Sequence, residues 1–238
     1  MGKAKDIIVK PIDSKFANSF IKKHHYSGKV VNNSKLHFGA FLNGRCHGVM
    51  SFGSPLDKRK VLPLVEGTGW NEMLELNRMA FDSVLPRNSE SRCISIAIKL
   101  IKKNAPHIKW ILSFADGTQC GDGTIYRASG FLLTNIKKNT SMWENIKTGE
   151  QRQDMQFFHT GTLSERYDGK WEKLKGYQLR YIYLIDKSCK ITVPILPFSE
   201  IDKMGARMYL GISGEKVSRS SSEESRRCNT DPNAPSKS

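Results

Sequence analysis

The sequence predicts a mixed α/β domain with helices on both faces of a central sheet. The first observation is the order of its segments, which is strand, helix, hairpin, long strand, helix, strand, helix, strand along the first 185 residues. The second is that 38% of the 238 residues are hydrophobic, which is enough to bury a full core. We therefore expect one domain over residues 1–212, followed by a tail.

The N-terminal segments have the clearest local signals. A short strand is expected in residues 7–13, and Asp13 or Ser14 is placed to cap a helix from about Lys15 to His24. Residues 36–53 form two strand-like runs around Asn43-Gly44, a dipeptide that strongly favours a hairpin turn. Residues 55–70 are interrupted by Pro and Gly and predict a loop.

The middle of the chain predicts three strands and two helices. The longer helix has apolar residues at positions i, i+3, i+4 and i+7, and two lysines near its C-terminal end. The shorter helix is expected to end at Gly130. In order, the expected elements are strand Glu72–Asp82, helix Ser89–Asn104, strand Trp110–Ala115, helix Thr124–Ser129 and strand Phe131–Ile136.

The C-terminal part is less regular. Residues 137–176 are basic, contain scattered aromatic residues and are expected to form an irregular insertion. Tyr177–Ile185 alternates as a strand, and residues 192–211 predict an extended segment with a short helix. Residues 213–238 have no apolar periodicity, so we expect a disordered tail.

The charge of the chain indicates a polyanionic partner. The formal net charge is +15 and the isoelectric point about 9.6, which favours nucleic acid over a generically basic protein. The five cysteines are scattered, without a C-x-x-C pair, and fit a reducing compartment. No signal peptide and no apolar run of about 18 residues is visible, so we expect a cytoplasmic protein.

A turn of polar residues leads from the long strand into the longer helix. Backbone N–H groups at the start of a helix are unpaired and carry partial positive charge, so they suit a phosphate group. The turn reads Arg-Asn-Ser-Glu-Ser-Arg, and a phosphate-bearing cofactor is expected there. The candidate cofactor-binding residues are Arg87, Asn88, Ser89, Ser91 and Arg92.

The element order, this turn and Asp116 followed by YRASGF at 126–131 resemble the GNAT-type N-acetyltransferase fold over about residues 5–185. The resemblance implies a central, mostly antiparallel sheet with helices on both faces. It also implies that the turn binds the pyrophosphate of acetyl-CoA or another acyl-CoA. Here Glu90 and Arg92 stand where that turn has glycine and a small residue.

A larger set of motifs is similar to the Mom family of phage DNA-modification proteins. The motifs are ELNRMAFD, LPRNSES, FADG, IYRASGF and the late YQLRYIYLIDK and VPILPFSEIDKMGARMYLG. The resemblance implies a phage- or prophage-encoded enzyme that converts adenine N6 in double-stranded DNA to a carbamoylmethyl adduct, protecting the DNA from restriction, with the adenine flipped out. The alternatives are an acetyltransferase for a protein lysine or small amine, and a non-catalytic DNA-binding protein of the same fold.

A first set of candidate catalytic residues surrounds the strand that ends at Asp116. Adenine N6 is a weak nucleophile, and a carboxylate suits the task of accepting its proton, although Asp before Gly is also a common turn former. Ser113 is expected on the same strand face, with Tyr126 beyond the turn. In the GNAT-type fold, a tyrosine at this place acts as general acid toward the CoA thiolate; the alternative is an aromatic that packs on the sheet.

A second set lies on the long strand and after the first helix. Glu75 and Arg78 are charged residues in a central strand, which is costly unless they are paired with one another or with Arg92. His25 and Tyr26 follow the first helix and are expected at the mouth of the site, contacting base or phosphate; the alternative is a capped helix end.

Basic residues outside these motifs are candidate DNA contacts. They are Lys29 and the run Lys58, Arg59 and Lys60, which suit sequence-independent contacts to phosphate; the alternative is a solvated surface. The aromatic residues of 137–176 could stack on an extruded base or form the core of a small insertion. No metal is predicted, although His25, His47 and Cys120 could be assembled from distant segments.

Overall fold

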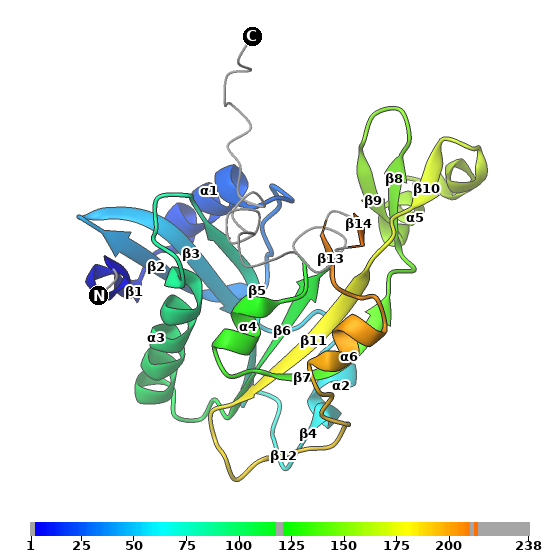
Figure 1. Ribbon diagram of the computed structural model, residues 1–238. Coiled ribbons are helices and arrows are strands. Elements are labelled where there is room, and N and C mark those ends of the chain that lie inside the picture. The colour runs from blue at the N-terminus through cyan, green and yellow to red at the C-terminus, as the bar shows by residue number, and fades with distance from the viewer. Residues whose placement is uncertain (1–2, 118–120, 210–211, 214–238) are drawn as a thin grey trace.

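The computed structural model describes residues 3–117, 121–209 and 212–213, with one large sheet at its centre (Figure 1). Within these ranges the sheet has seven strands in the order β1-β2-β3-β5-β6-β11-β7. Neighbouring strands are antiparallel except β5 and β6, which are parallel, and this confirms the predicted mixed α/β class. The strands are β1 (Ile8–Pro11), β2 (Ser34–Leu42), β3 (Arg45–Gly53), β5 (Met73–Phe81), β6 (Trp110–Asp116), β7 (Leu132–Lys138) and β11 (Tyr177–Leu184).

The first face of the sheet is covered by α1 (Ser14–His24). Its N-terminus is capped as predicted, because the Asp13 carboxylate accepts a hydrogen bond from the Phe16 N–H at 2.8 Å. Ala17 and Ile21 are buried against β3 and β5. We call this side of the sheet the α1 face.

The opposite face is covered by α3 (Ser89–Asn104) and α4 (Thr124–Ala128). The α3 bounds agree with the prediction, and Ile94 and Ile98 are buried in the largest core cluster. Gly130 follows α4 with φ +83°, a conformation that glycine adopts without steric cost. We call this side the α3 face.

The ladder between β5 and β6 is short. Its pairs run from Met73–Trp110 to Leu76–Ser113, although both strands continue beyond the last pair. At that pair the Ser113 hydroxyl donates to the Leu76 carbonyl oxygen at 3.0 Å. The next residue, Asn77, forms a bulge against β3, because the register there skips it. Beyond this point the two parallel strands are no longer paired with one another.

Residues 55–70 were predicted as a loop, and this was wrong. They form short elements that cover the α1 face beside α1, with apolar residues packed against Met73, Trp110 and Leu112. Such short elements depend on the strands beneath them and leave no periodic signal of their own. The elements are α2 (Lys58–Val61), the 3-10 helix Leu62–Leu64, and β4 (Val65–Glu66), which pairs with β12 (Lys190–Ile191).

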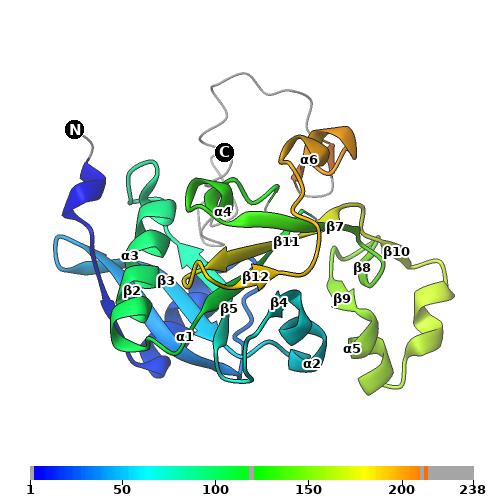
Figure 2. The same ribbon diagram turned by 90° about the horizontal axis from the view of Figure 1, so that it is seen from below.

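Residues 137–176 were expected to be irregular but form a small module, which projects on the side away from α3 (Figures 1 and 2). Trp143, Phe157 and Trp171 are its buried core, so three of the aromatic residues have the structural role considered above. Phe158 and Tyr167 are exposed. Its elements are β8 (Met142–Asn145), β9 (Gln151–Gln153), α5 (Asp154–His159), the 3-10 helix Leu163–Tyr167, and β10 (Trp171–Lys173).

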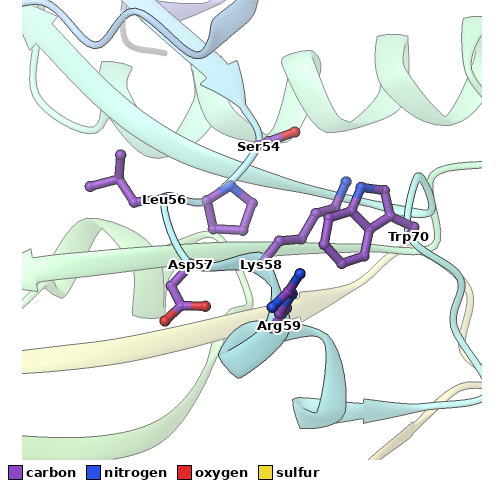
Figure 3. Close-up of a pocket in the computed structure, with 7 residues that line it drawn as sticks. Ser54, Leu56, Asp57, Lys58, Arg59 and Trp70 are labelled. Atoms are coloured by element: carbon purple, nitrogen blue, oxygen red, sulfur yellow. The ribbon is translucent and has the colours of Figure 1, made fainter.

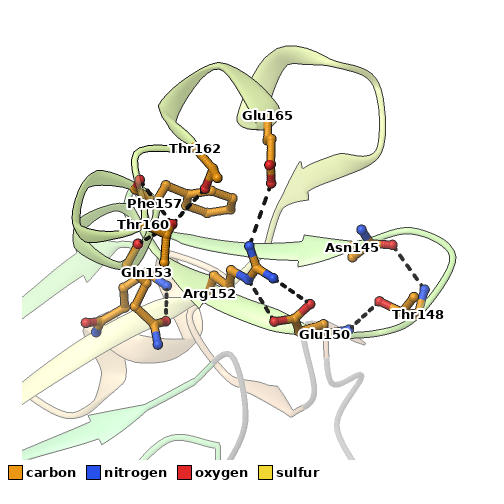
Figure 4. A network of polar contacts seen from close by, with 10 residues as sticks. Asn145, Thr148, Glu150, Arg152, Gln153, Phe157, Thr160, Thr162 and Glu165 are labelled. Carbon is orange, nitrogen blue, oxygen red and sulfur yellow. Dashed lines mark hydrogen bonds and ion pairs between the residues drawn. The ribbon is translucent and has the colours of Figure 1, made fainter.

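Polar contacts hold this module together (Figure 4). Arg152 forms ion pairs with Glu150 at 2.7 Å and with Glu165 at 3.7 Å, linking β9 to the 3-10 helix. The two ends of the module meet, because the Asn139 N–H donates to the Gly176 carbonyl oxygen at 2.8 Å. The module is therefore an extension of the hairpin between β7 and β11.

The remaining predictions concern the turns and the C-terminal part. Asn43 and Gly44 have φ values of +50° and +78°, as expected for the predicted hairpin turn. In the described residues no helix has the length and apolar character needed to span a bilayer. The predicted tail lies outside the described residues from 214 onward. The remaining elements are the 3-10 helix Lys3–Asp6, the expected short helix α6 (Ser199–Lys203), β13 (Met208–Tyr209) and β14 (Ile212–Ser213).

Candidate active site

Arg78 and Glu75 both lie on the α1 face of β5. Residues three apart on a strand normally face opposite ways, but the bulge at Asn77 places both on one side. Arg78 is fixed by its neighbours: its Nε donates to the Lys29 carbonyl oxygen at 2.9 Å, and its Nη1 donates to the Asn77 carbonyl oxygen at 2.7 Å. The loop after α1 is thereby tied to β5.

The Glu75 carboxylate has an environment that favours its protonated form. Burial raises its pKa to about 7, and the positive charge of Arg78 opposes this only in part. Within the described residues it forms no ion pair or hydrogen bond, so the suggested pairing with Arg78 or Arg92 was wrong. A carboxyl group with a pKa near neutrality suits general acid–base catalysis.

His25 is a neutral imidazole beside Arg78. Burial lowers its pKa to about 3, and the positive charge of Arg78 lowers it further. Its Nδ1 lies 2.8 Å from the Ser27 hydroxyl and accepts a hydrogen bond from the Ser27 N–H at 3.2 Å. Because Nδ1 accepts, the proton is assigned to Nε2. The Tyr26 ring lies 4.2 Å from the His25 ring. We call Glu75, Arg78 and His25 the β5 site.

A row of polar side chains extends from Arg78 across the neighbouring strands, and the sequence analysis missed it. Ser51 is paired with Arg78, and His37 with Ser51. His37 Nδ1 and Ser51 Oγ are hydrogen-bonded at 2.8 Å, and burial lowers the pKa of His37. The signal was one polar residue inside each of two apolar runs, His37 in LHFGAFL and Ser51 in GVMSFG, a pattern that is costly unless the groups are partnered.

Two amide side chains next to the β5 site retain unused hydrogen-bonding groups. Asn77 accepts from the Ser34 hydroxyl at 2.8 Å, and Asn33 donates to the Ser54 carbonyl oxygen. In the described part of the chain, Asn77 Nδ2 and Asn33 Oδ1 are buried without a partner. Buried polar atoms are usually satisfied, so these two are available to a ligand.

The expected cluster of Asp116, Ser113 and Tyr126 is divided between the two faces. Asp116 ends β6 and, by alternation with the buried Leu112, belongs to the α1 face. Ser113 is three residues earlier and lies on the α3 face, so the expected shared face was wrong. Tyr126 is 8% exposed in the core of the α3 face, with its ring 5.2 Å from that of Tyr181.

The predicted cofactor turn leads into α3. Asn88 has φ +66° and precedes the helix, and the Ser89 hydroxyl is buried and donates to the Pro86 carbonyl oxygen. The backbone N–H groups of Glu90 and Ser91 have no hydrogen-bond partner among the described residues. Two amides at this helix start are therefore free for an anion.

The two arginines of this turn differ in their surroundings. Arg87 is exposed at the start of the turn. Arg92 donates to the Lys5 carbonyl oxygen at 3.3 Å, on the side of the sheet away from Glu75. Of the five cofactor candidates, Arg87 and Ser91 are the side chains best placed to reach a phosphate.

The basic run at the start of α2 borders a surface pocket (Figure 3). Lys58 is buried, and its ammonium lies 5.0 Å from the centre of the Trp70 ring. Lys60 forms an ion pair with Asp57 at 3.0 Å. Lys58 therefore differs from the solvated lysine that the sequence suggested.

The residues considered for a metal site are not grouped. Across residues 3–117, 121–209 and 212–213, no cluster of three or more His, Cys, Asp and Glu side chains could hold an ion. His47 is paired with Asp82 at 2.8 Å. Cys120 lies outside the described residues.

Sequence comparisons give two matches. A family model described as the Mom protein family matches residues 6–200. The methylcarbamoylase mom of Escherichia phage Mu is 40% identical over 138 residues, which is 58% of this chain and 57% of that protein. The chain thus spans little more than half the length of this curated relative.

Solved structures with similarity to the chain are N-acetyltransferases. The ribosomal-protein-S18-alanine N-acetyltransferase of Escherichia coli has a TM-score of 0.44 at 10% identity, covering 76% of this chain and 94% of that one. An N-acetyltransferase of Staphylococcus aureus Mu50 has a TM-score of 0.45 at 11% identity, covering 76% and 99%. A GNAT family acetyltransferase of Elizabethkingia anophelis with acetyl-CoA bound has a TM-score of 0.39 at 12% identity, covering 75% and 98%.

Proposed function

The chain belongs to the Mom protein family, and from this premise we propose that it is a phage-encoded enzyme that modifies adenine N6 in DNA. The proposed product carries an acyl-derived, carbamoylmethyl-type group that protects the DNA from restriction in the host cytoplasm. The net charge of +15 supports a DNA substrate, because such a surface attracts phosphate. The methylcarbamoylase name of the phage Mu relative supports the type of group transferred.

The single observation that carries the catalytic part of this proposal is the Glu75 carboxyl. Adenine N6 must lose a proton as its bond to carbon forms, and a base with a pKa of about 7 accepts that proton efficiently near neutral pH. Glu75 therefore replaces Asp116 as the proposed proton acceptor. Asp116, on the same face and four residues beyond the β6 partner of Glu75, is proposed to orient the substrate without accepting the proton.

The neighbours of Glu75 have supporting roles in this proposal. The Arg78 guanidinium stabilises the negative charge on Glu75 before it accepts the proton. The neutral His25 donates from Nε2 to an acceptor atom of the base or of the incoming group. Tyr26 and Lys29, at the edge of the same loop, contact the DNA. The buried position of Tyr126 favours a packing role over that of general acid.

The turn before α3 fits the pyrophosphate of an acyl-CoA. It presents two unpaired amides, from Glu90 and Ser91, and the exposed Arg87 beside them. When bound, acyl-CoA would supply an activated acyl group, and transfer of that group alone would release CoA and leave an amide on N6 rather than a carbamoylmethyl group. The chain's own residues at the turn bind and orient the phosphates, while the unpaired part of β5 and β6 lies between the turn and the β5 site.

Three substitutions in this turn test the cofactor assignment. Arg87→Ala and Ser91→Ala are each expected to weaken CoA binding, Arg87→Ala by roughly tenfold, because a charge-assisted hydrogen bond is lost. Glu90→Gln is expected to strengthen it, because a negative charge beside the phosphates is removed. Isothermal titration with CoA measures all three, with Lys99→Ala, an exposed cation farther along α3, as the matched control. Unchanged affinity in all three variants would place the cofactor elsewhere.

The proposed activity is tested on DNA from cells that express the protein. Nucleosides from that DNA are separated and analysed by mass spectrometry, and an adenine nucleoside with the mass of the N6 adduct is expected. Unmodified adenine in the presence of folded protein contradicts the proposal. Acetylated lysines in the host proteins, without modified adenine, would support the alternative protein acetyltransferase.

A further inference from the structure

The pocket beside α2 is lined by residues from two separate segments. Residues 54–59 follow β3, and Trp70 lies shortly before β5 (Figure 3). The pocket has a volume of about 430 Å³. Its full lining is Ser54, Pro55, Leu56, Asp57, Lys58, Arg59 and Trp70.

Two cations of this pocket, Lys58 and Arg59, form no ion pair with any residue that the structure describes. Lys58 is only 8% exposed, and among the described residues its ammonium has no hydrogen bond or ion pair and lies over the Trp70 ring. Arg59 likewise forms no ion pair in the described part of the chain. The one carboxylate of the lining, Asp57, is paired with Lys60. The Lys58 ammonium borders the pocket without an ionic partner, so an anion such as phosphate could pair with it there.

Two apolar side chains are unusually exposed beside these cations. Trp70 is 52% exposed and presents an indole ring, the side chain on which a nucleic-acid base stacks well. Leu56 is 95% exposed at the tip of the loop after β3. Proteins that bend DNA insert apolar side chains such as leucine as wedges between stacked bases.

The pocket adjoins the β5 site through the end of β3. Gly53 is paired with Glu75, and Ser54 is the next residue. The Ser54 carbonyl oxygen accepts a hydrogen bond from the Asn33 amide, which belongs to the loop after α1. The pocket therefore begins one residue beyond the backbone partner of Glu75, and a ligand that extends from the pocket along β3 would approach the proposed base.

We propose that this pocket receives the extruded adenine nucleotide of the DNA substrate, with its base on Trp70 and its phosphate at Lys58 and Arg59. Leu56 fills the space that the base leaves in the duplex. This assignment rests on the proposed function and adds the place where the base is held. The adenosine phosphate of CoA has the same chemistry, but the pocket is on the α1 face and the cofactor turn begins α3 on the other side.

The test measures permanganate oxidation of the thymine opposite the target adenine, which becomes reactive when its partner leaves the stack. The wild-type protein is expected to make this thymine reactive. Trp70→Ala and Leu56→Ala should lower the reactivity on the order of fivefold or more, since losing one base–aromatic stack costs about 1–3 kcal/mol. Trp70→Phe keeps an aromatic ring and should show thymine reactivity close to that of the wild type. Tyr167→Ala removes another exposed aromatic residue and should leave the thymine reactivity unchanged.

Other results would contradict either the pocket assignment or the proposed function, and the two cases can be distinguished. Wild-type reactivity in both Trp70→Ala and Leu56→Ala overturns the pocket assignment. Unchanged reactivity together with weaker CoA binding by Trp70→Ala assigns the pocket to the cofactor. Modified adenine in cells with an unreactive thymine overturns the pocket alone, whereas absence of both DNA binding and modified adenine overturns the proposed function. Circular dichroism of each variant verifies that it is folded.

Discussion

Replacing Glu75 with glutamine is expected to abolish adenine modification and to stabilise the folded protein at neutral and alkaline pH. Glutamine keeps the shape of the side chain but cannot accept a proton. Loss of a positioned general base lowers the rate by roughly 10²–10⁴-fold. Quantification of modified adenine per unit of protein measures this effect.

The Glu75→Gln variant is expected to be more stable than the wild type at pH values above about 7. The pKa of Glu75 is raised from 4.5 to about 7 in the folded state, so folding binds a proton between these values. The free energy of unfolding of the wild type therefore falls as pH rises from about 4.5 through about 7. The free energy of unfolding of Glu75→Gln does not show this decrease, because glutamine does not titrate. The expected gain at pH 8 is about 2 kcal/mol, discounted for partial exposure of the side chain. Urea unfolding at pH 5 and pH 8 measures the difference.

Asp116→Asn is the matched control, because it makes the same chemical change to a second carboxylate of the α1 face. If Asp116 orients the substrate without accepting the proton, this variant keeps measurable activity and Glu75→Gln does not. The reverse result, with an active Glu75→Gln and an inactive Asp116→Asn, would restore Asp116 as the base that the sequence first suggested. It would also leave the raised pKa of Glu75 without a catalytic role.

Gly53→Ala is expected to lower the free energy of unfolding by about 3 kcal/mol, at the upper end of what overpacking usually costs. A Cβ at this position would lie 2.1 Å from the Asn33 carbonyl oxygen. The obstacle is backbone, so the loop after α1 must move. Because this loop carries Lys29, which accepts from Arg78, the substitution is also expected to reduce activity. Urea unfolding and nucleoside analysis measure the two effects.

Gly69→Ala is the control for this prediction. A Cβ there would lie no closer than 3.4 Å to the Glu72 carboxylate, the end of a flexible side chain, and the Gly69 N–H that donates to Glu72 is retained. We expect a change in stability within about 0.5 kcal/mol, as for an ordinary surface substitution. A Gly53→Ala protein as stable as Gly69→Ala would show that the loop is not held against β3 as described.

The parts of the fold that the sequence predicted well are those with strong local signals. The helix Ser89–Asn104 has the predicted bounds because its apolar spacing and terminal residues agree. The hairpin turn at Asn43-Gly44 needs only two residues of special backbone conformation. By contrast, α2, β4 and the module of residues 137–176 are made of short elements that are stable only against their neighbours.

For the candidate site, the sequence predicted the participating residues but not which of them lie together. The residue types around β5 were identified, but their grouping depends on the face of each strand. Ser113 and Asp116 are three positions apart, an odd offset that places them on opposite faces of a strand. Arg78 joins Glu75 only because Asn77 is bulged, and a bulge leaves no signal in the sequence. The pocket of Trp70 combines segments on either side of α2, and spacing alone does not predict that contact.

The hairpin that carries the module of residues 137–176 has a consequence for how this protein varies. The chain leaves the sheet at Asn139 and re-enters it at Gly176, with the two residues hydrogen-bonded at 2.8 Å. Whatever lies between them closes the same short gap, and the entropic cost of a longer closed loop grows only with the logarithm of its length. Because Trp143, Phe157 and Trp171 bury one another, the module brings its own core and borrows little from the sheet. Evolution could enlarge, shrink or exchange this segment while β7 and β11 keep their register, as insertions at hairpin tips are widely tolerated.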